Sequence, residues 1–431
     1  MTPQSSLMVA ARVDRKSLGG LRALLSTMNF APGRVNTANP LVPFGKLENL
    51  HFARFVILDD QTLDDIHRLY GLPRQEYPLY LAFTCDFDGG KAEFLRDLAN
   101  CAGPGLRRVF SFCEDFTDGA DLLQWIRDHD LPVATQYVNW RGRTMKQVRE
   151  EAGLRKAIDA YLDANAAVLE GQPAEHIRVK LRKFVEAEIA AGRLILTPPT
   201  PTPWGERIGN VVHLIGSGLL ILLLSPVALV LLVLIRLREN TEPVYAPRPD
   251  PDQAKALADI EDYEFTNQFS AMGSWKPGLV RRWMGRYILL VIDWTARHWP
   301  YTQGRLARVR TIHFARWVYL DGMKRIFFAT SYDGSLDSYN DDFINKVSFG
   351  LNVTFASGIG YPKTRWLLAG GAKDEQKFKD FLRRHQMPTD VWYNAHPSLT
   401  AVELERNSRI RQGLKAAALS DEAAREWVQL L

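Results

Sequence analysis

The chain has 431 residues, of which 46% are hydrophobic, 11% aromatic and 24% charged, so its composition excludes a generally disordered protein and its length allows two domains. The net charge of +5 comes without a concentrated basic stripe, which argues against a nucleic-acid partner. Cys85, Cys101 and Cys113 are an odd set without CxxC spacing, which argues against a disulfide framework and a zinc site.

The beginning of the chain contains no apolar run of signal-peptide length, so the large domains are expected in the cytoplasm. Residues 1–140 then alternate between runs typical of strands and runs with helical spacing. The predicted order is strand Leu7–Val13, helix Ser17–Met28, strands His51–Leu58 and Leu79–Cys85, helix Lys91–Ala102 and strand Arg107–Cys113, then a further helix and the strand Val133–Trp140.

Val211–Ile235 is a run of about 25 residues without a charge, which is long enough to cross the hydrocarbon core of a bilayer. A single span would place the two halves of the chain on opposite sides of the membrane. A re-entrant hairpin that reverses at Ser225-Pro226 would keep them together, because proline interrupts the helical hydrogen-bond ladder. The flanking charges do not decide between the spanning and the re-entrant form.

The second half predicts a similar order of elements. The elements are strand Phe265–Gly273, helix Gly278–His298, strands His313–Leu320 and Ile326–Tyr332 joined by a two-residue turn at Asp321-Gly322, helix Leu336–Val347, strand Leu351–Ser357, and a final helix and strand Asp390–Ala395. The helix Gly278–His298 mixes arginines with interfacial aromatics, which indicates a helix on the membrane surface. Alternatively, its apolar side (Leu279, Trp283, Ile288 and Ile292) packs on the second sheet.

Matching blocks recur in the same order in both halves. LHFARFVILDD (50–60) matches IHFARWVYLDG (312–322), Asp88-Gly89 matches Asp333-Gly334, 104–112 matches 349–357, and 125–132 matches 381–388. The order predicts an α+β fold of tandem ferredoxin-like modules that form a pseudo-dimeric α/β barrel, with one hydrophobic membrane segment between them. The expected parts are a first module (1–160), a helical linker (161–203), the membrane segment (204–240) and a second module with C-terminal helices (241–431).

The element order and the duplication resemble the dimeric α/β-barrel superfamily, which includes dye-decolorising peroxidases and chlorite-dismutase-like haem proteins. The resemblance implies a haem-dependent oxidoreductase. Dye-decolorising peroxidases carry a GxxDG motif whose Asp assists peroxide cleavage, and Asp333-Gly334 matches its end, whereas Thr330 replaces its first glycine. The run HFARWVYLDG…ATSYDGSLDSYNDDFINK also resembles a group of uncharacterised bacterial membrane-associated proteins, which brings no known activity.

Candidate catalytic residues are Asp333, Arg316 and His396, and candidate cofactor-binding residues are His396, Tyr361, Arg365 and Asn394. Arg316 recurs as Arg54 in an apolar strand, where it needs an anionic partner. Strand alternation predicts that the histidine and the arginine of each HFAR motif lie on opposite faces. Asp333, like Asp88, is expected to cap the helix that directly follows it.

His396 lies in WYNAHPSLT, which has no histidine at the corresponding place of the first half, and haem is its candidate cofactor. A metal site cannot be assigned from the sequence, which contains no Walker, GxSxG, HExxH or dinucleotide-binding glycine motif.

The expected partners are the lipid bilayer and a partner protein or a second copy of the chain. Three groups of basic residues beside apolar segments favour anionic headgroups: Arg178, Lys180, Arg182 and Lys183; Arg207, Arg236 and Arg238; and Arg281, Arg282 and Arg286. The sequence leaves two functional hypotheses: a membrane-associated oxidoreductase of peroxidase type or binding protein for lipid-soluble substrates, and a non-catalytic membrane scaffold that docks a partner enzyme.

Overall fold

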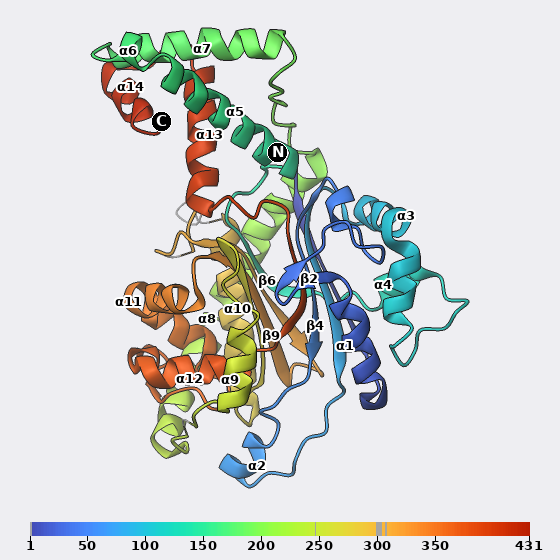
Figure 1. Cartoon of the computed structure of the whole chain (residues 1–431). Coiled ribbons are helices and arrows are strands. Elements are labelled where there is room, and N and C mark those ends of the chain that lie inside the picture. The colour runs from blue at the N-terminus through green and yellow to red at the C-terminus, as the bar shows by residue number, and fades with distance from the viewer. Residues whose placement is uncertain (1, 246, 299–303, 307) are drawn as a thin grey trace.

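The computed structural model describes residues 2–245, 247–298, 304–306 and 308–431. Helices take up 50% of the chain and strands 20%, which makes it a mixed α/β protein with several sheets and one long apolar helix. Two four-stranded antiparallel sheets occupy the centre, and helices cover the outer side of each (Figure 1).

Each large sheet takes one edge strand from the other half of the chain. The first sheet has the order β1 (Gln4–Arg12), β5 (Tyr80–Asp88), β4 (Leu50–Leu58), β12 (Thr389–Asn394). The second has the order β6 (Val133–Val138), β8 (Ile312–Leu320), β9 (Arg325–Asp333), β7 (Thr266–Ser274). The strand β12 from the C-terminal half therefore pairs with β4, and the strand β6 from the N-terminal half pairs with β8.

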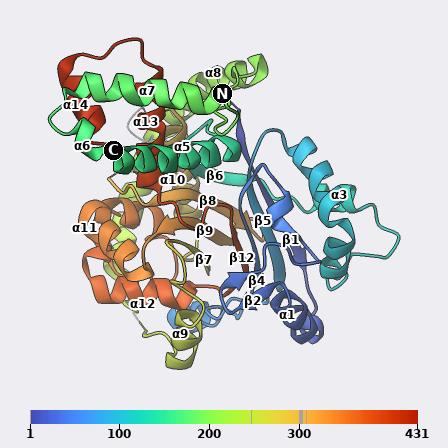
Figure 2. The same ribbon diagram turned by 45° about the horizontal axis from the view of Figure 1, so that its top comes forward.

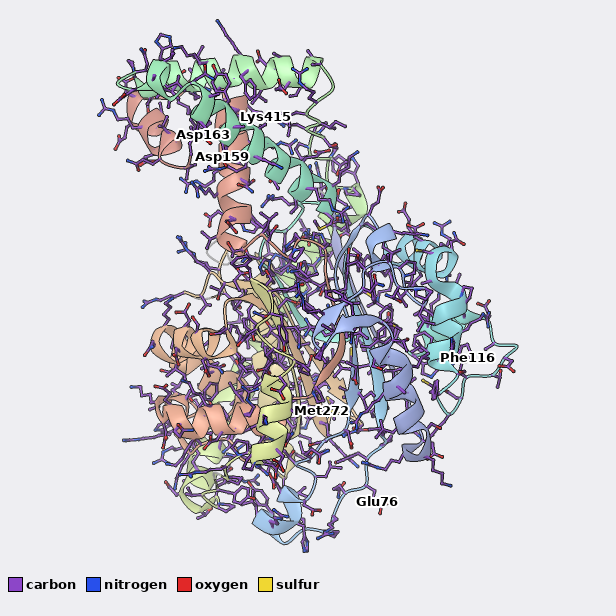
Figure 3. All side chains as sticks on the ribbon, viewed as in Figure 1. Glu76, Phe116, Asp159, Asp163, Met272 and Lys415 are labelled. Atoms are coloured by element: carbon purple, nitrogen blue, oxygen red, sulfur yellow. The ribbon has the colours of Figure 1, made fainter. Side chains whose placement is uncertain are left out.

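Apolar side chains from both sheets form a shared core between them. Val56 and Leu58 of β4 meet Val318 and Leu320 of β8 in this core, and Met272 of β7 also belongs to it (Figure 3). Alternate residues of β4, such as Phe55, point instead toward the helices of the first half, as the two-residue period of a strand requires. The sheets thus pack face to face.

The helices on the outer faces differ from the prediction at their C-terminal ends. The first sheet is covered by α1 (Leu18–Ser26), α3 (Lys91–Phe110) and α4 (Leu122–Asp128), and the second by α10 (Leu279–His298), α11 (Leu336–Phe355) and α12 (Glu375–His385). The strands predicted at Arg107–Cys113 and Leu351–Ser357 are wrong, because α3 and α11 extend into both segments.

The packing of α3 explains this difference. Its buried residues Leu98, Ala102, Leu106 and Val109 recur every three or four positions, and this helical period outweighs the β-forming composition of the segment. The helix also passes very close to a neighbouring loop at Gly105. A Cβ atom there would lie 1.9 Å from the carbonyl oxygen of Leu41, so only glycine permits the contact.

The hairpin between β8 and β9 is longer than predicted. Leu320 pairs with Arg325, so four residues form the connection rather than Asp321-Gly322 alone. The predicted positive φ angles are present, at 52° for Asp321 and 61° for Gly322, and Met323 adds a third at 65°. The other predicted strands of both halves are confirmed within a few residues of their expected ends.

A separate group of helices stands out from one end of the two-sheet body (Figures 1 and 2). It consists of α5 (Met145–Ala164), α6 (Ala166–Leu169), α7 (Ala174–Ala190), α13 (Ala401–Lys415) and α14 (Asp421–Val428). Its own small core includes Leu154, Leu181 and Trp427. The other short elements include α2 (Asp65–Tyr70), α9 (Pro251–Ala258) and the two-stranded pairs β2 (Asn29–Ala31) with β3 (Arg34–Val35) and β10 (Thr364–Arg365) with β11 (Ala369–Gly370).

The apolar segment forms part of α8 (Trp204–Thr241), a helix of 38 residues. It continues through Pro226, so the reversal considered at Ser225-Pro226 is absent from this helix. By length and composition it is the one helix among the described residues that is able to cross a membrane, and only 11% of its most apolar stretch is buried. The core helix of a soluble protein would be mostly buried.

Candidate functional site

A β-bulge interrupts both central strands at the histidine of the HFAR motif, at His51 in β4 and at His313 in β8. The bulge lets His51 reach the layer between the sheets, where its ring centroid lies 5.6 Å from that of Phe314 of the opposite sheet. Arg54 reaches the same layer. The prediction that histidine and arginine lie on opposite faces is therefore wrong, because one extra residue shifts the alternation.

Each bulge histidine is held by the aspartate that ends the neighbouring strand. His51 Nε2 lies 2.9 Å from Asp88 Oδ1, and His313 Nε2 lies 2.6 Å from Asp333 Oδ1. All four side chains are buried. A carboxylate beside the imidazole fixes the ring orientation and offsets the cost of burying both groups.

The second oxygen of each aspartate caps a helix that is distant in sequence. Asp88 Oδ2 accepts a hydrogen bond from Met145 N at the start of α5, and Asp333 Oδ2 accepts one from Ala401 N at the start of α13. The prediction that Asp333 caps the helix directly after it is wrong, because Ser335 caps α11. Asp333 is thus fully engaged by His313, Ala401 and the Thr266 hydroxyl.

Arg54 and Arg316 cross between the sheets in opposite directions. Arg54 donates to the carbonyl oxygens of Phe269 and Thr330 and to two serine hydroxyls of the second sheet. Arg316 donates to Leu7 O and pairs with Asp86 of the first sheet. The predicted anionic partner exists for Arg316 but not for Arg54 in the described part of the chain.

The environment of Arg54 is unusually unfavourable for a positive charge. Burial, and then the charge of Arg316, lower the pKa of Arg54 to about 9. The guanidinium also lies 4.8 Å from the centre of the Trp392 ring, a favourable cation–π distance.

His396 lies two residues beyond β12, in the same layer as the bulge histidines. Its ring is 5.1 Å from Phe52 and 5.4 Å from His313, measured between centroids. Burial, and then the neighbouring His313 and His51, lower the pKa of His396 well below its usual value, so the ring is neutral at pH 7. Among the described residues, its buried Nδ1 atom has no hydrogen-bond partner.

The other predicted site residues are divided between different places. Asn394 lies beside His396 and accepts a hydrogen bond from its backbone N–H at 2.9 Å. Tyr361 donates its hydroxyl to Asn352 within the core of the second-half helices, and Arg365 is exposed on the β10–β11 hairpin. The structure therefore groups Asn394 with His396 but does not bring Tyr361 or Arg365 to them.

The surroundings of His396 do not fit a haem ligand. His396 is buried, with 5% of its surface exposed, and it does not line the apolar or the polar pockets found among the described residues. The described residues also contain no group of three or more His, Cys, Asp or Glu side chains arranged to hold a metal ion. The residues around His396 therefore do not provide a haem site in the described structure.

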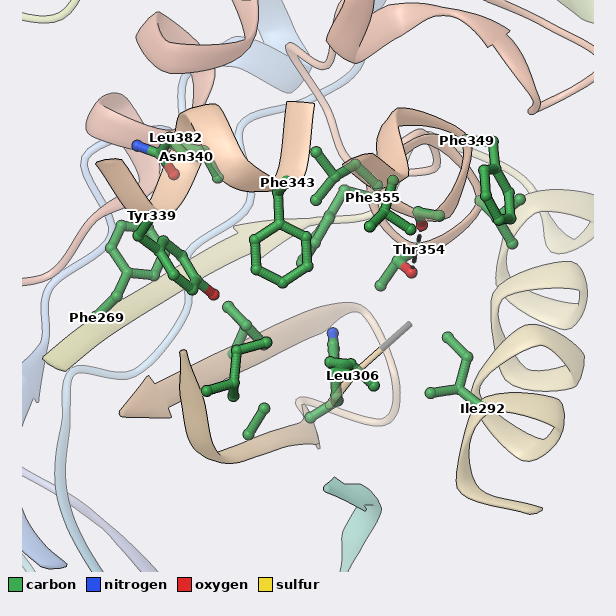
Figure 4. A pocket seen from close by; sticks show the side chains of 18 of the residues that line it. Phe269, Ile292, Leu306, Tyr339, Asn340, Phe343, Phe349, Thr354, Phe355 and Leu382 are labelled. Atoms are coloured by element: carbon green, nitrogen blue, oxygen red, sulfur yellow. Dashed lines mark hydrogen bonds between the residues drawn. The ribbon is translucent and has the colours of Figure 1, made fainter. Parts of the chain in front are cut away.

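The sequence reasoning missed a large apolar cavity on the outer side of the second sheet (Figure 4). The cavity has a volume of about 560 Å³ and lies between the sheet, α10 and α11. Its lining includes Ala315, Trp317 and Phe328 from the sheet, Ile292 and Ala296 from α10, and Phe343, Val347, Leu351 and Phe355 from α11. The apolar stripe of α11 was the available signal.

A break in α11 and a rim residue shape this cavity. Val347 lines the cavity and has non-helical φ and ψ angles of −147° and 31°, which mark a kink inside α11. Phe349 also lines the cavity although 59% of its surface is exposed, so it lies at the mouth. The hydroxyl groups of Thr295 and Thr354 donate to backbone carbonyls of their own helices, which leaves the cavity wall apolar.

The helix α10 separates this cavity from α8. It packs on β6 through bonds such as Thr135 Oγ1 to Leu289 O, so the expected packing of α10 on the second sheet is confirmed. Ile288 is buried as that alternative expected, whereas Leu279 and Trp283 are exposed. The charged side chain of Arg281 is buried against Glu242 rather than exposed to headgroups.

Polar contacts fix both ends of α8, on α10 at its start and on the β10–β11 hairpin at its end. Near the start of α8, Asn210 accepts two hydrogen bonds from Arg297 of α10. One turn later, His213 Nε2 of α8 lies 3.0 Å from Asp293 Oδ2 of α10. At the other end, the buried Glu239 accepts hydrogen bonds from Trp366 N, Leu367 N and the Thr364 hydroxyl.

In the helical group, Arg178 is buried and paired with Glu175, so this arginine is not a headgroup contact.

No protein-family model matches this chain, and comparisons with characterised proteins and with solved structures found no significant match.

Proposed function

We propose that this protein lies on one side of a membrane, with α8 in the lipid surface, and binds a lipid-soluble molecule in the apolar cavity. The observation that carries the proposal is the position of this cavity of about 560 Å³, which is built against α10, the helix on which the exposed apolar helix α8 packs. Pockets of about 300–1,000 Å³ with apolar walls are typical of small-molecule sites.

The exposed surface of α8 supports its location in lipid. One stripe of the helix, including Ala228 and Ile235, faces the body, while large apolar residues such as Leu219, Leu223 and Val230 are exposed. An apolar surface of this extent costs free energy in water and is rare on soluble monomers.

The contacts at both ends of α8 favour a helix that lies along the membrane surface rather than one that crosses it. Arg297 and Glu239 tie the two ends of the helix to the same two-sheet body. A crossing α8 would therefore pull α10 and its charged residues into the hydrocarbon, which is unfavourable. Both sheets then lie on one side of the membrane, which is the cytoplasmic side expected from the sequence.

The membrane location can be tested by adding charge to the exposed side of α8. Leu222 and Leu223 are exposed, the latter by 74%, so replacing both with glutamate leaves the packing on α10 intact but opposes lipid insertion. We expect the variant to be released by carbonate washing and to fail to float with phosphatidylcholine vesicles. The control is Val168→Glu with Ile189→Glu, on exposed sites of the helical group, and its flotation should match that of the unmodified protein. Equal flotation of the α8 variant would overturn the proposed location.

Ligand binding can be tested separately by filling the cavity. Ala315→Leu with Thr354→Leu adds apolar volume from two opposite walls. We expect weaker binding of the fluorescent probe N-phenyl-1-naphthylamine and the loss of apolar molecules that organic extraction recovers from the purified protein. Ala187→Leu, on the exposed side of α7, is the control. If the unmodified protein neither binds the probe nor yields an extractable molecule, the binding function fails and the alternative of a non-catalytic scaffold is favoured.

We infer that the two halves are copies of a ferredoxin-like unit whose sheets face each other in a pseudo-dimeric α/β barrel. The matching bulges at His51 and His313, the matching helix caps at Asp88 and Asp333, and the reciprocal exchange of β6 and β12 support this inference. A superposition of two experimentally determined halves that is no better than chance would contradict it.

The hypothesis of a peroxidase-type oxidoreductase rests on the sequence resemblance to dye-decolorising peroxidases alone. The carboxylate of Asp333 is used to hold His313 and α13, and Arg316 is paired with Asp86, so neither faces a pocket for peroxide in the described structure. The absence of a Soret absorption band from the purified protein, or its survival in His396→Ala, would contradict haem ligation by His396.

A further inference from the structure

A second pocket, polar and about 380 Å³ in volume, lies where β1, β6 and the adjacent ends of α8 and α10 meet. It is on the other side of α10 from the apolar cavity, because Ile292 and Ala296 line the cavity whereas Asp293 and Arg297 line the pocket. The charged side chains that face the pocket are Lys91, Arg141, Glu206, Asp293 and Arg297. The first turns of α8 form part of its wall.

Two of these cations have no carboxylate partner in the described part of the chain. Lys91 pairs with Asp130, and Asp293 pairs with His213 at 3.0 Å. Among the described residues, Arg297 donates only to the neutral amide oxygen of Asn210, at 2.9 and 2.6 Å. Arg141 has a buried Nε atom without any hydrogen-bond acceptor among the described residues. Glu206 is exposed on the first turn of α8.

The two arginines are also close enough to repel each other. Burial, and then the charge of Arg297, lower the pKa of Arg141, and Asp293 offsets only part of this effect. Gln136 adds, at the same pocket, a buried Nε2 donor for which the described part of the chain offers no acceptor. Buried donors without acceptors are costly, and a bound anion would satisfy them and relieve the repulsion.

We propose that Arg141 and Arg297 bind the phosphate group of an anionic lipid headgroup. A guanidinium group donates two parallel hydrogen bonds to phosphate oxygens, a geometry that a lysine cannot provide. A lipid is favoured over a free phosphate ester because Asn210 of α8 lines the pocket and its neighbours Val211 and Val212 are exposed apolar residues. The lipid assignment rests on the proposed membrane location of α8, whereas the anion site itself does not.

The experiment compares the unmodified full-length protein with Arg141→Gln/Arg297→Gln and with Arg282→Gln/Arg286→Gln. The second double variant removes the same charge from the part of α10 that lies away from the pocket. Flotation is measured with vesicles of phosphatidylcholine alone, with added phosphatidate, and with added palmitate at the same surface charge. Calorimetry of the detergent-solubilised protein with inorganic phosphate and glycerol phosphate tests free phosphate. Thermal unfolding shows whether each variant is folded.

We expect phosphatidate to strengthen vesicle binding more than palmitate does. This preference for phosphatidate should fall by about tenfold or more in the Arg141/Arg297 variant, and in that variant alone. Equal effects of phosphatidate and palmitate, or an equal loss in the Arg282/Arg286 variant, would overturn the proposal. Tight calorimetric binding of glycerol phosphate without a phosphatidate preference would overturn the lipid assignment and identify the ligand as a soluble phosphate. If no vesicle binds any form of the protein, the membrane location fails, and calorimetry still decides whether the anion site exists.

Discussion

Arg54 and Arg316 occupy matching strand positions and cross the inter-sheet layer in opposite directions, but only Arg316 ends on a carboxylate. The residue that contacts Arg316 is Asp86, two positions before Asp88, and the corresponding residue of the second half is Ser331, which contacts Arg54. The two arginines therefore have similar burial but different electrostatic partners.

This difference predicts unequal effects of the same substitution. Arg316→Met leaves the buried Asp86 without a cation and should lower the free energy of unfolding by roughly 3–5 kcal/mol. Arg54→Met leaves only neutral acceptors and should cost no more than about 1–2 kcal/mol. Adding Asp86→Ser to Arg316→Met should restore much of the loss. Chemical denaturation measures all three variants, and equal costs for the two single substitutions would refute the electrostatic account.

The aspartate caps predict effects on helices that are far away in sequence. Asp88→Ala should increase amide hydrogen exchange at the start of α5, near Met145, whereas Asp333→Ala should do so at the start of α13, near Ala401. Each substitution should cost about 1–2 kcal/mol through the lost cap, and more because the buried histidine loses its carboxylate partner. Exchange followed by mass spectrometry tests the assignment. Changes confined to α3 or α11, the helices that directly follow the aspartates, would contradict it.

Asp390 predicts a pH dependence of stability. Burial raises the pKa of Asp390 in β12 to about 6, although its carboxylate accepts a hydrogen bond from Ile57 N. The folded state thus binds the proton more tightly than the unfolded state, so this residue lowers stability as the pH rises from about 4 to about 6.

Asp390→Asn should remove this dependence and raise the free energy of unfolding above pH 6 by about 1–3 kcal/mol. The amide oxygen can still accept the bond from Ile57. Asp380→Asn, on α12, serves as the control and should leave the profile between pH 4 and 6 unchanged. An unaltered slope in the Asp390 variant would show that other groups cause the dependence.

Glu239 predicts a local effect at the end of α8. Its carboxylate accepts hydrogen bonds from Trp366 N at 2.7 Å and Leu367 N at 3.0 Å, and both of these residues have left-handed φ angles, of 59° and 57°. Such a backbone is strained for residues other than glycine, and the carboxylate offsets the strain. Glu239→Ala should cost about 2–4 kcal/mol and expose these two amides to hydrogen exchange. Glu206→Ala, on the exposed first turn of α8, should change neither quantity.

The sequence predicted the elements whose signals are local. The aromatic and branched residues of β4 predicted a strand, and the apolar run in α8 predicted a segment of membrane-spanning length, because both signals depend on neighbouring residues only. The C-terminal part of α3 was mistaken for a strand because Val109 and Phe110 favour strands, and the long-range packing of Leu106 was not visible in the sequence.

The candidate site was predicted less well, because its geometry is non-local. The bulge at His51 turns this side chain to the face of the sheet opposite the expected one. Asp333 caps a helix that starts 68 residues later. Asn394 and His396 are adjacent because they are close in sequence. Tyr361 is distant in sequence, and the fold places it in the core of the second-half helices instead. The kink at Val347, which lines the apolar cavity, had no local signal in the sequence.

Because of the exchanged strands, the two sheets are completed at different times during synthesis. The second sheet receives its borrowed strand β6 before its own strands are made, but the first sheet waits for Thr389–Asn394. The hydrogen-bonding edge of β4 therefore stays open until almost the whole chain, including α8, has left the ribosome. A chain that stops after residue 388 would have a complete second sheet and an uncovered first one, so the loss of C-terminal residues would promote aggregation through the N-terminal half.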